Sequence, residues 1–314
     1  MTGGLAPINP FQLAGWGPLC PWKHPEHRDC YVDVDHTREQ YDEFTRRMTG
    51  LATLMEYGQL VLVTGDSGCG KTALVNWCAD WVAETLREGG ERPATRCEIV
   101  DLTSSLAGRL ELPVDERMSI VCDRLFGDLR RRGAMRPDAL ADLAPDRDRP
   151  DRIYPDLSDA LHEDVALVIL LPTPRELKNE VIRYATYISP RVLFLVESAF
   201  LDEEDVADIA EALKDGVEPV TLRVGPLEPG DVWRFVNARQ QRAEEMGRYP
   251  RMDESSAKAV ERLLLSVAQL ERVLIRTYET RRHSALEYDK GCAVTADDIR
   301  QQFPKLVGAD HERP

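Results

Sequence analysis

Short apolar runs rich in β-branched residues recur along the first two thirds of the chain and predict buried strands. The clearest runs are residues 59–64, 165–171 and 192–196, and two more polar runs lie at 97–102 and 220–224. Segments with apolar residues at helical spacing lie between them. Five short strands that alternate with helices are typical of a parallel sheet covered on both faces, so we expect an α/β fold.

The helical patterns divide the chain. Beyond residue 228 we find only helical spacing, which predicts a small helical domain after the sheet. Residues 133–155 are rich in Arg, Asp and Pro and predict a solvated loop. The expected domains are an irregular N-terminal arm (1–35), an α/β core (36–226) and a helical domain (227–314). The expected helices cover residues 36–55, 73–87, 115–132, 156–162, 174–188, 202–214, 231–246, 255–264, 269–283 and 296–303.

A glycine-rich loop separates the first predicted strand from the helix that follows it. Its sequence, GDSGCGKT, matches the phosphate-binding pattern G-x-x-x-x-G-K-[ST]. The glycines allow a tight turn in which successive amide N–H groups point at one phosphate. The lysine reaches the terminal phosphates, and the threonine hydroxyl ligates Mg²⁺. The predicted nucleotide-binding residues are therefore Gly65, Asp66, Ser67, Gly68, Cys69, Gly70, Lys71 and Thr72, with Thr72 as the Mg²⁺ ligand.

Composition and charge limit the classes of partner. The 314 residues are 43% hydrophobic and 30% charged, as in soluble globular proteins. A formal net charge of −15 repels nucleic acid, so a nucleic-acid partner is disfavoured. No apolar run is long enough to span a bilayer, and the first residues do not resemble a secretory signal. Seven scattered cysteines do not predict a disulfide framework, so we expect a cytoplasmic protein.

The order of these parts resembles the AAA+ and STAND branch of P-loop ATPases, in the group that includes origin-recognition ATPases and ExeA-type secretion ATPases. This resemblance implies ATP and Mg²⁺ as cofactors, bound between the α/β core and a helical lid. Arg272 is near the position of the sensor-2 arginine, which would report lid closure. The other similar segments are Asn9-Pro10-Phe11, Thr37-Arg38-Glu39 (with Thr37 in place of a glycine), Val220 to Leu227 with Glu228 to Asp231, and Thr295 to Asp298.

The third predicted strand departs from this family. There the strand ends in two acidic residues, whereas here it runs through Leu171 into Pro172-Thr173. Three interpretations remain open. In the first, the strand at 192–196, followed by Glu197, is the true acidic strand. In the second, it is the fourth strand, which lies between the first and the third and places Glu197 beside the γ-phosphate. In the third, the protein binds nucleotide but hydrolyses it little. Strand counting favours the second or third, and the candidate catalytic residues are Lys71 and Glu197.

The N-terminal arm contains a candidate metal site. Cys20, His24, His27 and Cys30 lie within eleven residues and could close a tetrahedral zinc site. Their spacing is tighter than the usual two-knuckle pattern. The alternative is an arm packed on the ATPase domain through its tryptophans, Trp16 and Trp22.

Two classes of function follow. The first is a switch that binds ATP or ADP and signals to a protein partner or to further copies of the chain, with weak hydrolysis. The alternative is an ATPase motor or loader that assembles and remodels a protein or nucleic-acid client. The motor requires a working acid and an arginine supplied in trans, for which Arg191 and Arg223 are loose candidates. A DNA loader is disfavoured by the charge, and the sequence shows no separate acceptor site for a small-molecule kinase.

Overall fold

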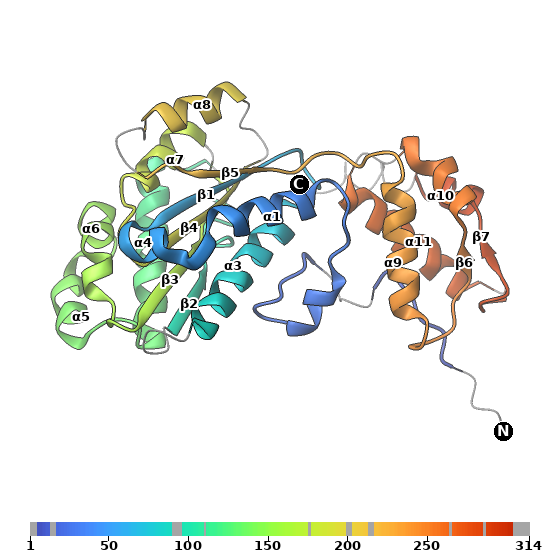
Figure 1. The fold of residues 1–314 in the computed structure, drawn as a ribbon, viewed down its shortest axis with the longest axis horizontal. Coiled ribbons are helices and arrows are strands. Elements are labelled where there is room, and N and C mark those ends of the chain that lie inside the picture. Colours follow the sequence, from blue (N-terminus) through green and yellow to red (C-terminus); the bar gives the residue numbers. More distant parts are fainter. Residues whose placement is uncertain are drawn as a thin grey trace. The chain divides into compact units, whose positions relative to one another are not determined.

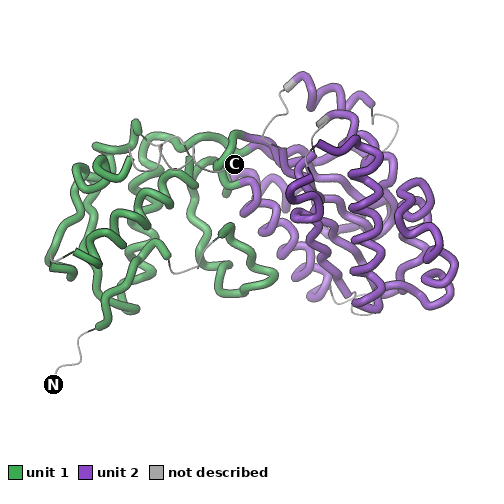
Figure 2. Tube along the Cα trace, turned by 180° about the vertical axis from the view of Figure 1, so that it is seen from behind, with its two compact units in different colours: residues 1–38, 66–70, 224–314 green, residues 39–65, 71–223 purple. Residues whose placement is uncertain are grey.

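The computed structural model contains two compact units, which Figure 2 colours separately. The sheet unit comprises residues 39–65 and 71–223, and the helical unit comprises residues 1–38, 66–70 and 224–314. This division differs from the predicted one because it places the N-terminal arm and residues 66–70 with the C-terminal helices. The structure describes residues 5–12, 17–89, 96–109, 111–174, 177–198, 203–212, 217–263, 266–284 and 287–303.

The sheet unit is built on a five-stranded parallel sheet with the order β2-β3-β4-β1-β5 (Figure 1). The predicted α/β fold is therefore confirmed. All five strands end at the same edge because they are parallel, and β4 lies between β1 and β3. The strands are β1 (Gln59–Thr64), β2 (Arg96–Asp101), β3 (Val165–Leu170), β4 (Val192–Ser198) and β5 (Val220–Arg223).

Helices cover both faces of this sheet. Leu62, Leu167 and Phe194 face a large apolar core with residues of α4, α6 and α7, whereas alternate strand residues point to the other face, which α3 covers. The strands are apolar on both faces for this reason. The helices of the unit are α1 (Thr37–Arg47, whose first two residues belong to the helical unit), α2 (Ala52–Tyr57), α3 (Lys71–Glu88), α4 (Val114–Arg132), α5 (Pro137–Leu143), α6 (Pro150–Ala160), α7 (Leu177–Ala185) and α8 (Glu203–Ala212), with short 3₁₀ helices at Thr49–Leu51 and Ala144–Asp146.

Two expectations for the sheet unit are wrong. The predicted helix over 36–55 is interrupted near Gly50, whose φ of 69° is not helical. The predicted loop over 133–155 contains α5 and the first half of α6. Proline in the first turn of each helix fixes a helical φ, and Leu143 and Ile153 are buried in the core. The charged residues of this stretch lie on the outer faces and conceal its apolar spacing.

The helical unit contains four α-helices within the described residues, as its pattern predicts, together with a short parallel strand pair. The N-terminal arm is part of this unit. Phe11 packs against Phe235 and Tyr278, and the Asn9 side-chain amide donates to the Ile275 carbonyl at 3.0 Å. The elements are η1 (Pro25–Cys30), α9 (Asp231–Ala243), β6 (Arg251–Met252), α10 (Glu254–Val260), η4 (Glu261–Leu263), α11 (Val267–Arg282), β7 (Ala293–Val294) and α12 (Ala296–Arg300).

No helix among the described residues combines the length and the apolar character that crossing a bilayer requires.

Candidate nucleotide-binding site

The glycine-rich loop lies between β1, which ends at Thr64, and α3, which begins at Lys71. This is the strand–loop–helix context that the motif requires. Gly65, Gly68 and Gly70 have φ values of 141°, 83° and 78°, which residues other than glycine rarely adopt. The sequence therefore needs glycine at all three positions, and the backbone amides between them are available to turn toward a common centre.

Within the helical unit, residues 66–70 lie close to two other segments, the start of α11 and the turn that contains Asp35. The Ala268 N–H donates to the Gly68 carbonyl at 3.1 Å, at the first turn of α11. A Cβ atom at Gly68 would lie 2.8 Å from Ser266 Oγ, and one at Gly70 would lie 2.9 Å from Asp35 Oδ2. Glycine is thus needed at positions 68 and 70 for two reasons: the backbone conformation, and the neighbouring atoms that leave no room for a side chain.

Replacement of Gly70 by alanine is expected to lower the free energy of unfolding by about 1–2 kcal/mol, because alanine disfavours a left-handed backbone. Urea unfolding measures this change. Gly127→Ala on α4 is the control: its Cβ would meet only the flexible end of Arg131, at 3.4 Å, and alanine is favoured in helices. Equal stability of Gly70→Ala and the wild type would contradict the described loop conformation.

Lys71, Thr72 and Glu197 all lie at the edge of the sheet where the strands end. The Lys71 ammonium donates to the Gly65 carbonyl at 2.7 Å, and the Thr72 hydroxyl donates to Glu197 Oε2 at 2.7 Å. Glu197 reaches Thr72 because β4 lies directly beside β1, with Val63 and Glu197 in register. A hydroxyl and a carboxylate in contact are the hard oxygen ligands that Mg²⁺ prefers, so these residues fit a magnesium–nucleotide ligand.

The strand order bears on the interpretations of Glu197. β3 occupies the third position and β4 lies between β1 and β3, which is the arrangement that the second interpretation expects. The position expected of Glu197 in the second interpretation, on a fourth strand next to β1, is the one observed.

A buried ion pair lies close to the end of β3, where the ATPases that the sequence resembles have acidic residues. The Arg117 guanidinium on α4 donates to Glu180 on α7 at 3.2 Å and to the Thr173 carbonyl at 3.0 Å. Both charged side chains are buried, at 1% and 0% exposure. Sequence reasoning missed this pair. The sequence did contain a sign of it: Arg117 lies four residues before Val121, on the apolar face of α4. A charged residue on a buried face requires an oppositely charged or hydrogen-bonding partner.

The arginines singled out in the sequence have different surroundings. Arg191 immediately precedes β4, and its guanidinium donates hydrogen bonds to the carbonyls of Ser158, His162 and Val165. These bonds link α6 to the edge of the sheet where the strands begin, which is opposite the edge where Thr72 lies. The role of Arg191 as an arginine supplied in trans stays a prediction. Arg223 ends β5, beside the end of β1. Arg272 is an exposed residue of α11, six positions after the N-cap Ser266.

The structure does not bring the predicted zinc ligands together. His27 Nδ1 accepts a hydrogen bond from the Cys20 N–H at 3.0 Å, and the buried Cys30 thiol donates to the Glu26 carbonyl at 3.5 Å. His24 lies 3.6 Å from the Glu26 carboxylate. Across the described ranges, the one group of three potential metal-ligand atoms close together is Glu287, Asp289 and Cys292. The Trp22 ring contacts Lys23, and Trp16 lies outside the described residues.

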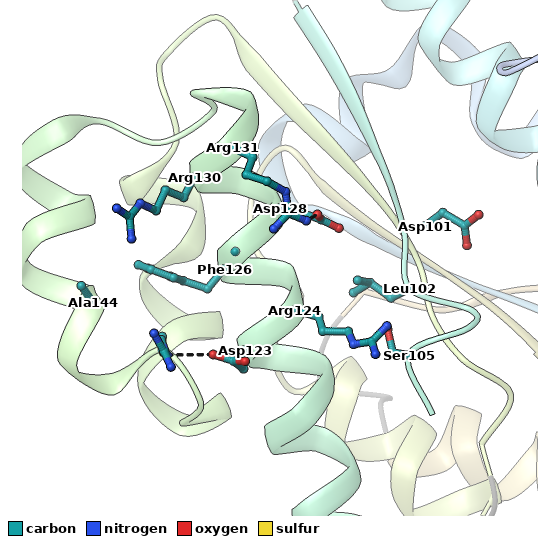
Figure 3. Close-up of a pocket in the computed structure, with 12 residues that line it drawn as sticks. Asp101, Leu102, Ser105, Asp123, Arg124, Phe126, Asp128, Arg130, Arg131 and Ala144 are labelled. Carbon is teal, nitrogen blue, oxygen red and sulfur yellow. Dashed lines mark hydrogen bonds and ion pairs between the residues drawn. The ribbon is translucent and has the colours of Figure 1, made fainter. Parts of the chain in front are cut away.

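A polar cavity of about 440 Å³ opens beside α4 in the sheet unit (Figure 3). Its charges are largely paired: Arg147 lies 2.8 Å from Asp123, and Arg131 pairs with Asp128. Asp101 accepts hydrogen bonds from Thr103, as a cap of the turn after β2. β2 is the strand farthest from β1 on this side of the sheet, so the cavity is separate from the Thr72–Glu197 contact.

Comparison with known proteins shows the fold. No family model and no curated protein matches the sequence. The structure is similar to the Aeropyrum pernix ORC2 protein in ADPNP–ADP complexes, with a TM-score of 0.53 and 15% identity, covering 96% of this chain and 72% of that one. It is similar to the Aeropyrum pernix ORC1 protein in complex with DNA, with a TM-score of 0.56 and 14% identity, covering 88% and 66% of the two chains. At these identities the comparison shows the fold alone, which this chain shares with the two ORC proteins.

Proposed function

We propose that this protein is a cytoplasmic switch that binds ATP with Mg²⁺ at residues 65–72 and signals its nucleotide state to a protein partner or to further copies of itself. The observation that carries the proposal is the contact of Thr72 with Glu197 immediately after a phosphate-binding loop. The ORC2 relative of similar fold was solved with ADPNP and ADP. All seven cysteines are free thiols, which agrees with a reducing compartment.

Each part of the site has a role in binding. The loop amides would hold the phosphates, and the Lys71 ammonium would leave the Gly65 carbonyl to pair with them. Thr72 and Glu197 would hold Mg²⁺, directly or through its water ligands. Bound Mg²⁺ supplies charge neutralisation at the phosphate oxygens. We further propose that Arg272 on α11 responds to the nucleotide, as the sensor-2 arginine does in related ATPases.

A switch is favoured over a motor because the site has few acids. Leu171 and Pro172 follow β3, and the Thr173 carbonyl beyond them accepts a hydrogen bond from Arg117, whose guanidinium also binds the buried Glu180. Glu197 is thus left as the single described acid in contact with the loop-end Thr72. In this proposal it helps to hold the metal rather than to activate a water. Slow hydrolysis leaves ATP bound long enough for a partner to recognise that state.

Replacement of Glu197 by glutamine is expected to keep ATP binding within a few-fold of wild type and to change an already slow turnover little. Glutamine retains an oxygen that accepts the Thr72 hydrogen bond. Equilibrium titration and phosphate release measure the two quantities, with Glu204→Gln on the exposed face of α8 as the control. Rapid wild-type turnover that collapses in Glu197→Gln would favour the motor instead.

The partner class is inferred from charge. The ORC1 relative was solved with DNA, whereas a net charge of −15 opposes such binding here. We therefore expect a protein partner or self-assembly. Light scattering with and without ATP tests for self-assembly.

A further inference from the structure

Asp35 is a buried carboxyl beside the phosphate loop, within the helical unit. Its exposed fraction is 2%. Oδ1 accepts a hydrogen bond from the Thr37 hydroxyl, whereas Oδ2 has no hydrogen-bond partner. A Cβ atom at Gly70 would lie 2.9 Å from this Oδ2. Burying an acceptor without a donor costs about 1–3 kcal/mol, so the position of Oδ2 calls for an explanation.

The backbone holds Asp35 in this position. Asp35 and the next residue, His36, both have left-handed φ values, 51° and 63°, which are uncommon in residues other than glycine. The Asp35 N–H donates to Asp231 Oδ2 at 3.1 Å, and its carbonyl accepts from the Gly225 N–H at 3.1 Å. Two hydrogen bonds therefore fix a strained segment so that its carboxyl faces Gly70.

The groups that face this carboxyl determine its ionisation. Asp231 on α9 is buried and is paired with Arg234, and His36 lies 3.3 Å from Glu228. The phosphate loop presents the backbone of Gly70. Burial raises the pKa of Asp35 to about 7; the hydrogen bonds from Thr37 lower it, the charge of Asp231 raises it, and His36 lowers it slightly.

We propose that Asp35 is a proton-binding site coupled to the phosphate loop: it takes up one proton from solvent when the loop binds the phosphates of ATP, so that ATP is held more tightly at lower pH. This inference rests on the proposed function. An ionised Asp35 would repel phosphates at the neighbouring loop. Protonation removes this repulsion. It also places a hydrogen on Oδ2, which is then no longer a buried acceptor without a donor.

The sign of the pH dependence follows from linkage. With a pKa of about 7 in the free protein and a higher pKa in the complex, binding takes up a proton between those two values. Affinity is then greatest below pH 7 and falls as the pH rises. A rise of about one unit on binding makes ATP binding about fivefold weaker at pH 8 than at pH 6.

Calorimetric titration of the full chain with ATP and excess Mg²⁺ tests this inference. Titrations at pH 6, 7 and 8, each in two buffers of different ionisation enthalpy, give both the affinity and the number of protons taken up. The wild type should lose affinity toward pH 8 and take up a fraction of a proton near pH 7. Asp35→Asn should bind at pH 8 about as tightly as the wild type does at pH 6, with that uptake lost.

Three further variants separate titration from a structural effect. Asp33→Asn, two residues away and exposed, should behave as the wild type, and His36→Gln should retain the uptake. Thr37→Val removes a hydrogen bond that favours the ionised carboxylate, so the loss of affinity should move to higher pH. This shift in pH is a readout that misfolding would not produce.

The outcomes distinguish the inference from the proposed function. Wild-type binding of equal strength at pH 6 and pH 8 overturns the inference alone. A pH dependence that persists unchanged in Asp35→Asn, with Thr37→Val also unchanged, does the same. Absence of ATP binding at every pH overturns the proposed function, and this inference with it.

Discussion

Replacement of Lys71 by alanine is expected to raise the Kd for ATP by at least about 100-fold. The ammonium is the one described side-chain cation at the end of the phosphate loop, and charge-assisted bonds to phosphate contribute about 1.5–3 kcal/mol each. A 100-fold loss corresponds to about 2.7 kcal/mol. Equilibrium titration with ATP and Mg²⁺ measures this change directly.

The matched control is Lys258→Ala. Lys258 is an exposed lysine of α10 that pairs with Glu254, so its removal should leave the Kd for ATP unchanged. Thermal unfolding of both variants checks that they fold. Binding by Lys71→Ala within a few-fold of the wild type would show that nucleotide, if bound, does not use this loop.

Replacement of Arg117 by methionine is expected to lower the free energy of unfolding by about 3–5 kcal/mol. The change leaves the Glu180 carboxylate buried at 0% exposure without its partner. Urea unfolding measures the loss. Replacing both residues with methionine should restore much of the stability, because the penalty arises from one unpaired charge rather than from the loss of the pair.

A neighbouring ion pair provides the control. Arg183 of α7 pairs with Asp115 of α4 across the same two helices, but both side chains are exposed, at 41% and 81%. Arg183→Ala should therefore cost at most about 1 kcal/mol. Similar small losses in Arg117→Met and Arg183→Ala would contradict the burial assigned to the Arg117–Glu180 pair.

The sheet and its loop could be predicted because their signals are local. Runs such as 59–64 are apolar on both faces since helices cover both faces of the sheet, and glycines mark the positions with positive φ. Helix α6 was not predicted in full, because its buried residues alternate with Arg, Asp and Pro. The break at Gly50 was missed because apolar spacing continues across it.

The features of the site that escaped prediction depend on residues distant in sequence. Arg117 and Glu180 are 63 positions apart, and the contact of Asp35 with Gly70 joins two loops. In the N-terminal arm, by contrast, spacing suggested a metal site, while the structure uses His27 Nδ1 to accept a backbone hydrogen bond. Spacing alone does not fix which way a side chain points in a proline-rich segment.

We propose that this chain holds ATP and hydrolyses it slowly. The most direct test is to incubate the wild-type protein with ATP and Mg²⁺, remove free nucleotide by rapid gel filtration, and identify what remains bound. We expect close to one nucleotide per chain, most of it still ATP after many minutes. Recovery of protein without nucleotide would contradict ATP binding, and recovery of ADP alone would contradict slow hydrolysis.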